Sequence, residues 1–316
     1  MTESLKYNFG SSGKPWGDTE KEQWLSMQET KRSYQVEVLD KLSLIKPNFN
    51  VSKYGALSID KARYPLFAFK SQDWQTDKKT ILVTGGVHGY ETSGVQGAIR
   101  FLERVASNPA HYGAFNYIVV PCVSPWGYET INRWNAKAID PNRSFYANSP
   151  AEESALLIAF IESFNSSEAD KHQGIICHID LHETTDTDNS EFRPALAARD
   201  AIEQQVWSIP DGFYLVGNLT NPVPDFQTAI IKAVEQVTHI APATDGKLIG
   251  VPIEQFGVIN YEGRKLGLCM GLTDAEFVTT TEVYPDSPRS DEENCILAQV
   301  AVIEGAISFL STEQAF

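Results

Sequence analysis

The sequence predicts an α/β protein with a mixed, largely parallel central sheet and helices on both of its faces. Two observations predict this class. Short apolar runs typical of buried strands alternate with longer stretches of helical periodicity, and no linker, composition break or internal repeat divides the chain. A chain of 316 residues is long enough to bury a large core. We expect one main domain over residues 51–316, with residues 1–50 as a helical appendage packed on it.

The first half of the chain alternates between the two kinds of element. Apolar residues at helical spacing predict a helix or helix pair between about residues 16 and 45. Strands are expected at 51–57, 64–71 and 80–85. A helix should follow over 91–106, because Asn108-Pro109 would end it. The apolar run 116–123 predicts a buried strand that is closed by Ser124-Pro-Trp-Gly.

The second half continues the alternation. A helix is expected over 150–164, because Pro150 suits the first turn and two glutamates there complement the helix dipole. Strand-like runs cover 174–181, 212–217 and 277–283, and helices are expected at 225–237 and 291–310.

The charge and composition exclude some classes of partner. The formal net charge is −15, whereas nucleic acids and anionic membrane surfaces attract basic patches. We also expect no membrane-spanning segment, since no apolar run approaches the ~20 residues that span a bilayer. The N-terminus lacks the apolar core of a secretory signal. The four cysteines are scattered, so we expect free thiols in a cytoplasmic protein, with two disulfides as the alternative. The sequence does not indicate an oligomeric state.

The most informative segment follows the strand expected at 80–85. An apolar run ends in Gly85-Gly86, and His88 and Glu91 follow at a spacing of three. Open α/β sheets place their ligands at the carboxyl ends of such strands. Imidazole nitrogen and carboxylate oxygen are both zinc ligands. In isolation, the same pair is also typical of a surface turn.

A third candidate ligand is His182, which also ends an apolar run and should emerge at the same sheet edge. Two histidines and one carboxylate leave a coordination position open, which is the pattern of hydrolytic zinc sites. His178 and Asp180 share a strand face with His182. Asp180 is therefore either a partner of a ligand or a pocket residue, while His178 is better explained as a core histidine.

Two other segments carry polar residues that suit a hydrolytic site. Arg133 and the pair Asn142-Arg143 form a candidate clamp for a carboxylate or carbonyl, although solvated loop arginines would look the same. Glu282 interrupts a β-branched strand, and a carboxylate near an activated water would be a general base. Simple alternation toward solvent would also explain Glu282.

Together these segments resemble the zinc carboxypeptidase family, whose relatives include the succinylglutamate desuccinylase and aspartoacylase enzymes. The family pattern is H-x-x-E, then R-x-N with D-x-N-R, then a His after a strand, then a strand Glu. It matches this chain in order over about residues 80–285. The resemblance implies that His88, Glu91 and His182 bind one zinc ion. It also implies that Glu282 activates the water and delivers its proton to the leaving amine.

The remaining implied roles concern the substrate. Arg133 would polarise the scissile carbonyl and stabilise the oxyanion, and Asn142 and Arg143 would grip a free carboxylate. Tyr261 is the best match to the mobile tyrosine that precedes the catalytic Glu. The chain departs from the family in one turn, where Ser124-Pro-Trp-Gly replaces the usual N-P-D-G.

The resemblance leaves three hypotheses for function. The first is a zinc-dependent carboxypeptidase that hydrolyses an amide next to a free carboxylate in a short peptide. The second is an amidohydrolase that removes an acyl group from an N-acyl amino acid. We expect the peptidase, because only a short segment with one predicted helix follows Glu282. The third, a non-catalytic binding protein on the same fold, would lack a ligand or the base, and all the matched residues are present.

Overall fold

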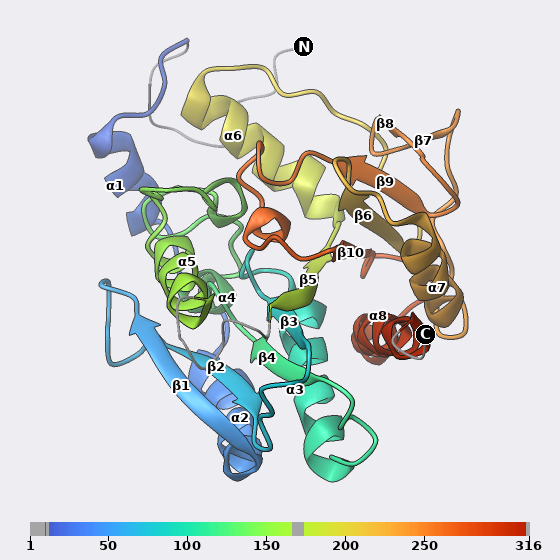
Figure 1. The fold of residues 1–316 in the computed structure, drawn as a ribbon. Helices are drawn as coiled ribbons and strands as arrows, with labels where there is room; N and C mark the ends of the chain where they lie inside the picture. The colour runs from blue at the N-terminus through green and yellow to red at the C-terminus, as the bar shows by residue number, and fades with distance from the viewer. Residues whose placement is uncertain (1–9, 11–12, 166–173, 314–316) are drawn as a thin grey trace.

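The computed structural model describes residues 10, 13–165 and 174–313. Eight strands form one sheet in the order β1-β2-β4-β3-β5-β10-β6-β9 (Figure 1). The central strands β4, β3, β5 and β10 run parallel to one another, and β6 pairs with β9 in parallel. The pairs β1–β2, β2–β4 and β10–β6 are antiparallel. The expectation of a mixed, largely parallel sheet is confirmed.

The elements have the following bounds. The strands of the main sheet are β1 (Phe49–Ala56), β2 (Pro65–Ser71), β3 (Thr80–Gly85), β4 (Asn116–Val120), β5 (Ile175–Glu183), β6 (Tyr214–Asn218), β9 (Val258–Tyr261) and β10 (Phe277–Val283), and β7 (Lys247–Leu248) pairs with β8 (Val251–Pro252) in a two-stranded ribbon. The α-helices are α1 (Asp18–Ser26), α2 (Asp40–Ile45), α3 (Thr92–Ser107), α4 (Pro125–Thr130), α5 (Glu152–Asn165), α6 (Arg193–Asp200), α7 (Pro224–Val234) and α8 (Glu292–Glu313). Short helical turns are η1 (Gln35–Leu39), η2 (Lys46–Asn48), η3 (Pro141–Arg143), η4 (Asp188–Phe192) and η5 (Cys269–Gly271).

Both faces of the sheet are buried, which explains why its central strands read as continuous apolar runs. Ile81 and Val83 of β3 belong to one core cluster, whereas Leu82 between them belongs to the other. Helices α2, α3, α7 and α8 contribute to the first cluster. Helix α5 and the segment around η5 contribute to the second. Alternate side chains of β3 therefore anchor opposite layers of the fold.

The described part of the proposed N-terminal appendage packs tightly. Trp16, Trp24 and Tyr34 are all buried and belong to the same core cluster as the sheet residues. Trp24 contacts the rings of Trp126 and Trp134. The helix pair expected between residues 16 and 45 is present as α1 and the continuous η1–α2 segment.

Some elements were not expected from the sequence. The segment after Ser124 is not only a turn, because it forms α4. Helix α6, the ribbon β7–β8 and strand β9 also had no predicted counterpart. The expected strands, and the helices that became α3, α5, α7 and α8, are confirmed to within a few residues.

Helix α8 corrects the expectation that no segment could span a bilayer. The segment Glu292–Thr312 is long enough and apolar enough to cross a bilayer, judged by its length and composition alone. In the fold, the middle of this helix is largely buried, and α8 packs on α3 and α7. A core helix that is covered on most sides has the same composition as a membrane span.

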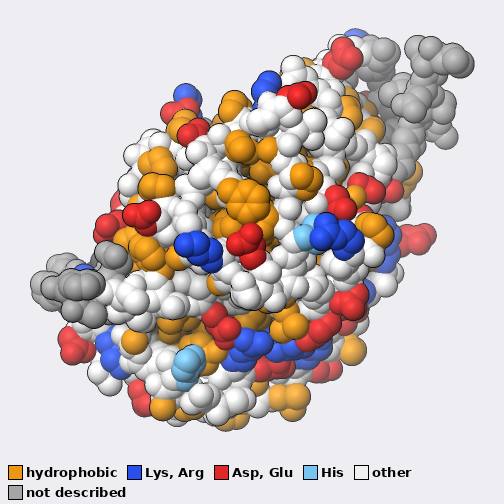
Figure 2. Space-filling model, turned by 90° about the vertical axis from the view of Figure 1, so that its right-hand side faces the viewer, with side chains coloured by type: hydrophobic (Ala, Val, Ile, Leu, Met, Phe, Trp, Pro, Cys, Tyr) orange, Lys and Arg blue, Asp and Glu red, His pale blue; other side chains and the backbone are white. Residues whose placement is uncertain are grey.

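The four cysteines are free and buried, as the sequence predicted. The face shown in Figure 2 mixes acidic and basic side chains around scattered apolar ones. This face of the acidic chain therefore carries no continuous field of one sign.

Glu153 on α5 gives a prediction about stability. Its carboxylate is buried, Oε2 accepts a 3.1 Å hydrogen bond from Asn135 Nδ2, and Oε1 has no partner among the described residues. Burial raises the pKa of Glu153 above its ordinary value, although the Asn135 hydrogen bond opposes this. Because the pKa of Glu153 is higher in the folded state than in the unfolded state, its contribution to the free energy of unfolding is most favourable at pH values below the unfolded pKa. It falls as the pH rises toward the folded pKa.

We expect Glu153→Gln to raise the free energy of unfolding at neutral pH. The free energy of unfolding of the variant should also change less with pH above pH 4. The gain should be about 1.4 kcal/mol for each unit by which the pKa is raised. Denaturant unfolding across pH 4–8 measures it, with the exposed Glu235→Gln as a control. A variant that is less stable than the parent at pH 7 would contradict this account.

Candidate active site

One cavity at the carboxyl ends of the central strands contains every residue that the sequence analysis singled out as a site residue. Its volume is about 790 Å³, within the usual range of ligand sites. The predicted residues that line it are His88, Glu91, Arg133, Asn142, Arg143, His182, Tyr261 and Glu282.

The turn after β3 positions the first two of these residues. Gly86 adopts a left-handed φ of +61°, and a Cβ there would lie 2.6 Å from Val95 Cγ2, so only glycine fits this turn. The chain then reverses into α3, with Glu91 as its N-cap residue. This short path places His88 and Glu91 side by side, with His88 Nδ1 2.7 Å from Glu91 Oε1.

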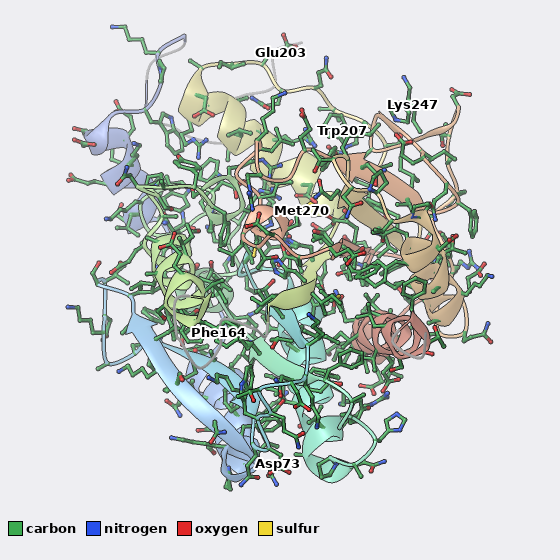
Figure 3. All side chains as sticks on the ribbon, in the orientation of Figure 1. Asp73, Phe164, Glu203, Trp207, Lys247 and Met270 are labelled. Atoms are coloured by element: carbon green, nitrogen blue, oxygen red, sulfur yellow. The ribbon has the colours of Figure 1, made fainter. Side chains whose placement is uncertain are left out.

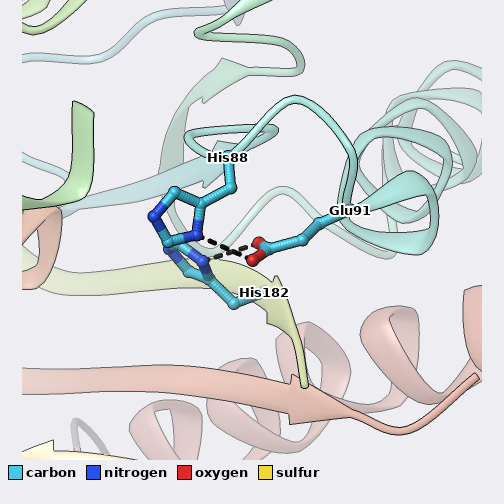
Figure 4. Close-up of side chains that lie close together, drawn as sticks. All are labelled: His88, Glu91 and His182. Carbon is cyan, nitrogen blue, oxygen red and sulfur yellow. Dashed lines mark hydrogen bonds and ion pairs between the residues drawn. The ribbon is translucent and has the colours of Figure 1, made fainter. Parts of the chain in front are cut away.

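His182 reaches the same point from β5, which pairs with β3 in parallel. His182 Nδ1 lies 2.7 Å from Glu91 Oε2 (Figure 4). All three side chains are at most 2% exposed, and one ligand atom from each lies within 4.8 Å of the others.

The residues fit a bound cation. Glu91 Oε2 is buried and receives no well-aligned hydrogen bond from any described residue. Burial would raise the pKa of Glu91, but His182 and His88 outweigh it and lower that pKa to about 2. The carboxylate is therefore charged, and both imidazoles present Nδ1 toward it. Two nitrogens and a carboxylate oxygen converging in this way form a donor set suited to zinc.

Each histidine is oriented by a further carboxylate at its other ring nitrogen. His88 Nε2 lies 3.0 Å from Asp140 Oδ1, and His182 Nε2 lies 2.8 Å from Asp180 Oδ2. Thr84 Oγ1 donates a 2.6 Å hydrogen bond to Asp180 Oδ1 and so fixes that carboxylate. Such partners set the tautomer and orientation of metal-binding histidines. Asp180 thus partners a candidate ligand, which decides between the two roles that the sequence left open.

His178 lies deeper on the same strand face. Its Nε2 is 3.0 Å from Thr84 Oγ1, and its Nδ1 has no partner among the described residues. Burial lowers the pKa of His178 to about 4, so it is neutral. This is the core histidine that the sequence favoured, although it lies near Asp180 and Cys269 in a second group of possible metal ligands.

Glu282 lies beside the histidine ligand because β10 pairs with β5 in parallel with Glu282 opposite His182. Thr184 Oγ1 donates a 2.6 Å hydrogen bond to Glu282 Oε2. Since that hydroxyl proton is used, the Tyr214 hydroxyl must donate to Thr184 Oγ1, at 2.7 Å. Burial raises the pKa of Glu282 to about 7, with His182 opposing the shift and Glu91 adding to it. The side chain is partly buried and is suited to exchange a proton near neutral pH.

Arg133 is held in place by two carboxylates. Its Nε donates to Asp140 Oδ2 at 3.1 Å and its Nη1 to Asp188 Oδ1 at 3.3 Å. No described residue accepts from Nη2, which leaves this donor for a ligand in the cavity. Arg143 is more accessible, and its Nη1 donates to the carbonyl oxygen of Asn142 at 2.7 Å.

The other two predicted residues have different surroundings. Asn142 is buried, and its Oδ1 accepts a 2.7 Å hydrogen bond from the backbone amide of Cys269, so this atom supports the loop. Tyr261 ends β9 and lines the cavity. Burial and Glu282 raise the pKa of Tyr261, so its hydroxyl keeps its proton.

Several cavity residues were not predicted from the sequence. Asp188, Arg193 and Trp207 come from the segment between β5 and β6, and Trp16 comes from the N-terminal part. Nothing in the local pattern of these residues points to a site. The backbone amide of Trp16 donates to the carbonyl of Arg199 at 2.7 Å, which ties these two distant segments together at the cavity.

Several solved structures have a fold similar to that of this protein. A metallo-carboxypeptidase from Burkholderia cenocepacia is 17% identical, with a TM-score of 0.59 over 86% of this chain and 68% of that chain. Bovine thrombin-activatable fibrinolysis inhibitor, solved with tick carboxypeptidase inhibitor, is 12% identical, with a TM-score of 0.56 over 96% and 99%. A Shewanella denitrificans protein named provisionally as a metallopeptidase is 17% identical, with a TM-score of 0.63 over 87% and 88%. At these identities the likeness concerns the fold, which is that of the metallo-carboxypeptidases.

The sequence also matches a family model over part of its length. Residues 37–173 match the model of the zinc carboxypeptidase family, the family that the motifs of this chain resemble. No curated protein sequence matches the chain.

Proposed function

We propose that the protein is a zinc-dependent metallocarboxypeptidase that hydrolyses an amide bond next to a free carboxylate in a short peptide. One observation carries the proposal. His88, Glu91 and His182 converge in a cavity where Glu282 lies beside His182 in the strand register. The match of residues 37–173 to the zinc carboxypeptidase family model supports the same activity.

His88, Glu91 and His182 would hold a single zinc ion. Bound there, zinc would act as a Lewis acid on the substrate carbonyl and lower the pKa of the attacking water. Arg143 would bind the free carboxylate of the substrate at the accessible side of the cavity, with Asn142 and Tyr261 beside it. The scissile carbonyl would then lie between Arg133 and the three residues that would hold zinc.

The chain's own residues would then move the proton and stabilise charge. Glu282 accepts a proton from water as the oxygen attacks the carbonyl carbon, and a C–O bond forms. Arg133 stabilises the negative charge on the carbonyl oxygen through its free Nη2. Glu282 then delivers the proton to the amide nitrogen, the C–N bond breaks, and the amino acid leaves as an amine. Thr184 keeps Glu282 oriented throughout.

A substrate panel tests the proposal. Dipeptides and acylated dipeptides with varied C-terminal residues are compared with N-acyl amino acids, each with and without a chelator. We expect release of the C-terminal amino acid from the peptides, lost with chelator and restored by zinc. Cleavage confined to the N-acyl amino acids would instead favour the deacylase, and hydrolysis that a chelator leaves unchanged would refute a zinc enzyme.

The carboxylate behind His182 gives a prediction about metal affinity. Asp180→Asn keeps the size of the side chain but removes the negative charge that orients His182. We expect zinc affinity to fall about 10- to 100-fold, the usual cost of losing such a partner. Competition with a chromophoric chelator measures this, and Asp140→Asn should behave similarly at His88. Unchanged affinity in both variants would contradict the proposed ligand set.

A further inference from the structure

Two of the arginines that line the cavity have no carboxylate as an ion-pair partner among the described residues. Four arginines line it: Arg133, Arg143, Arg193 and Arg199. Arg133 pairs with Asp140 and Asp188, and Arg199 pairs with Asp200 at 2.7 Å and 2.9 Å. Within the described part of the chain, no carboxylate forms an ion pair with Arg143 or Arg193. Two guanidinium groups without a direct ion-pair partner therefore line one cavity in a protein of net charge −15.

Arg193 is fixed in place without being neutralised. It is the first residue of α6, and its Cζ lies 3.7 Å from the ring centroid of Trp207, which is labelled in Figure 3. Its Nη1 donates to the carbonyl of Gln205 at 2.8 Å. Its Nε is buried and has no acceptor among the described residues. A planar guanidinium that is held on an aromatic ring, with donors unused, is prepared to bind an oxyanion.

Arg193 and Arg143 line the same cavity, and their charges affect the same neighbouring groups. Burial lowers the pKa of Arg193, and the nearby positive charges of Arg133 and Arg143 lower it further, while Asp188 opposes them. Both Arg143 and Arg193 also act electrostatically on Tyr261. A single carboxylate that pairs with Arg143 in bidentate fashion uses both of its oxygens and leaves Arg193 without an anionic partner.

We propose that the substrate carries a second carboxylate, and that Arg193 binds it. This inference rests on the proposed function, in which Arg143 takes the carboxylate next to the scissile bond. The second carboxylate belongs either to the side chain of the leaving amino acid, as in a C-terminal acidic residue, or to the acyl part of the substrate. Both sources present the same chemistry to Arg193, and matched substrates separate them.

Two acid and amide pairs test the proposal. Benzoylglycyl-glutamate is compared with benzoylglycyl-glutamine, and succinyl-phenylalanine with its succinamoyl analogue. One pair should show a kcat/KM for the acid about ten- to a hundred-fold above that for the amide, as expected for one charge-assisted contact. Arg193→Gln should bring this ratio close to one, chiefly by lowering kcat/KM for the acid. Arg193→Lys should restore part of the ratio, and Arg100→Gln, which changes a half-buried arginine outside the cavity, should leave it as in the parent.

The outcomes are distinct. An acid-over-amide ratio near one in the parent for both pairs would overturn the proposal, and so would a high ratio that survives Arg193→Gln. If none of the four compounds is hydrolysed, the proposed function fails, and the same compounds then serve as ligands in calorimetric titrations. Tighter binding of an acid than of its amide, lost in Arg193→Gln, would still support the second carboxylate site, and equal binding would overturn it.

Discussion

Glu282→Gln should lower kcat by about two to four orders of magnitude, the usual range for loss of a general base. The substitution keeps the shape of the side chain and its hydrogen bond with Thr184, but it removes the group that accepts the water proton. Because the carboxylate lies beside His182 and is not one of the converging ligands, zinc binding should be retained.

The measurement is a single-turnover rate on a peptide that the parent hydrolyses, together with the zinc content of each preparation. Glu276→Gln provides the control, because Glu276 is exposed just before the same strand. Full activity in Glu282→Gln with zinc bound would exclude Glu282 as the base. Loss of both activity and zinc would show instead that the variant disrupts the metal site.

His88→Ala should have the second large effect. It removes one of the three converging donors, and we expect zinc affinity to fall by more than about 100-fold, since loss of an outer partner alone costs about 10- to 100-fold. Activity at limiting zinc should fall to background. His111→Ala, which changes an exposed histidine outside the cavity, is the matched control. A His88→Ala protein that binds zinc as tightly as the parent would place the metal elsewhere, for example at the group formed by His178, Asp180 and Cys269.

The parts of the fold that could be predicted are those with strong local patterns. The buried strands β3 and β5 are continuous apolar runs because both faces of the sheet are covered, and their polar ends identified His88 and His182. Helix α6 was missed because Arg193–Asp200 is only eight residues long and Leu196 is its one large aliphatic residue. Strand β9 is only four residues long and lies at the edge of the sheet, where little periodicity can accumulate.

The parts of the site that could be predicted are those with fixed spacing along the chain. The residues missed by sequence reasoning, such as Arg193 and Trp207, act through contacts between segments that only the folded chain brings together. Asn142 shows a different difficulty. Its motif identifies it as a site residue, but in the structure its Oδ1 accepts a hydrogen bond from the backbone amide of Cys269. A motif therefore indicates that a residue belongs to a site, whereas its role depends on what it contacts.

The central claim is that one zinc ion at His88, Glu91 and His182 drives release of a C-terminal amino acid. The most direct test follows release of that amino acid from an acylated dipeptide while zinc is titrated into metal-free protein. The account predicts that activity rises in proportion to bound zinc and reaches its maximum at one equivalent. Activity that is already complete in the metal-free protein, or stoichiometric zinc binding with no release from any peptide, would contradict it.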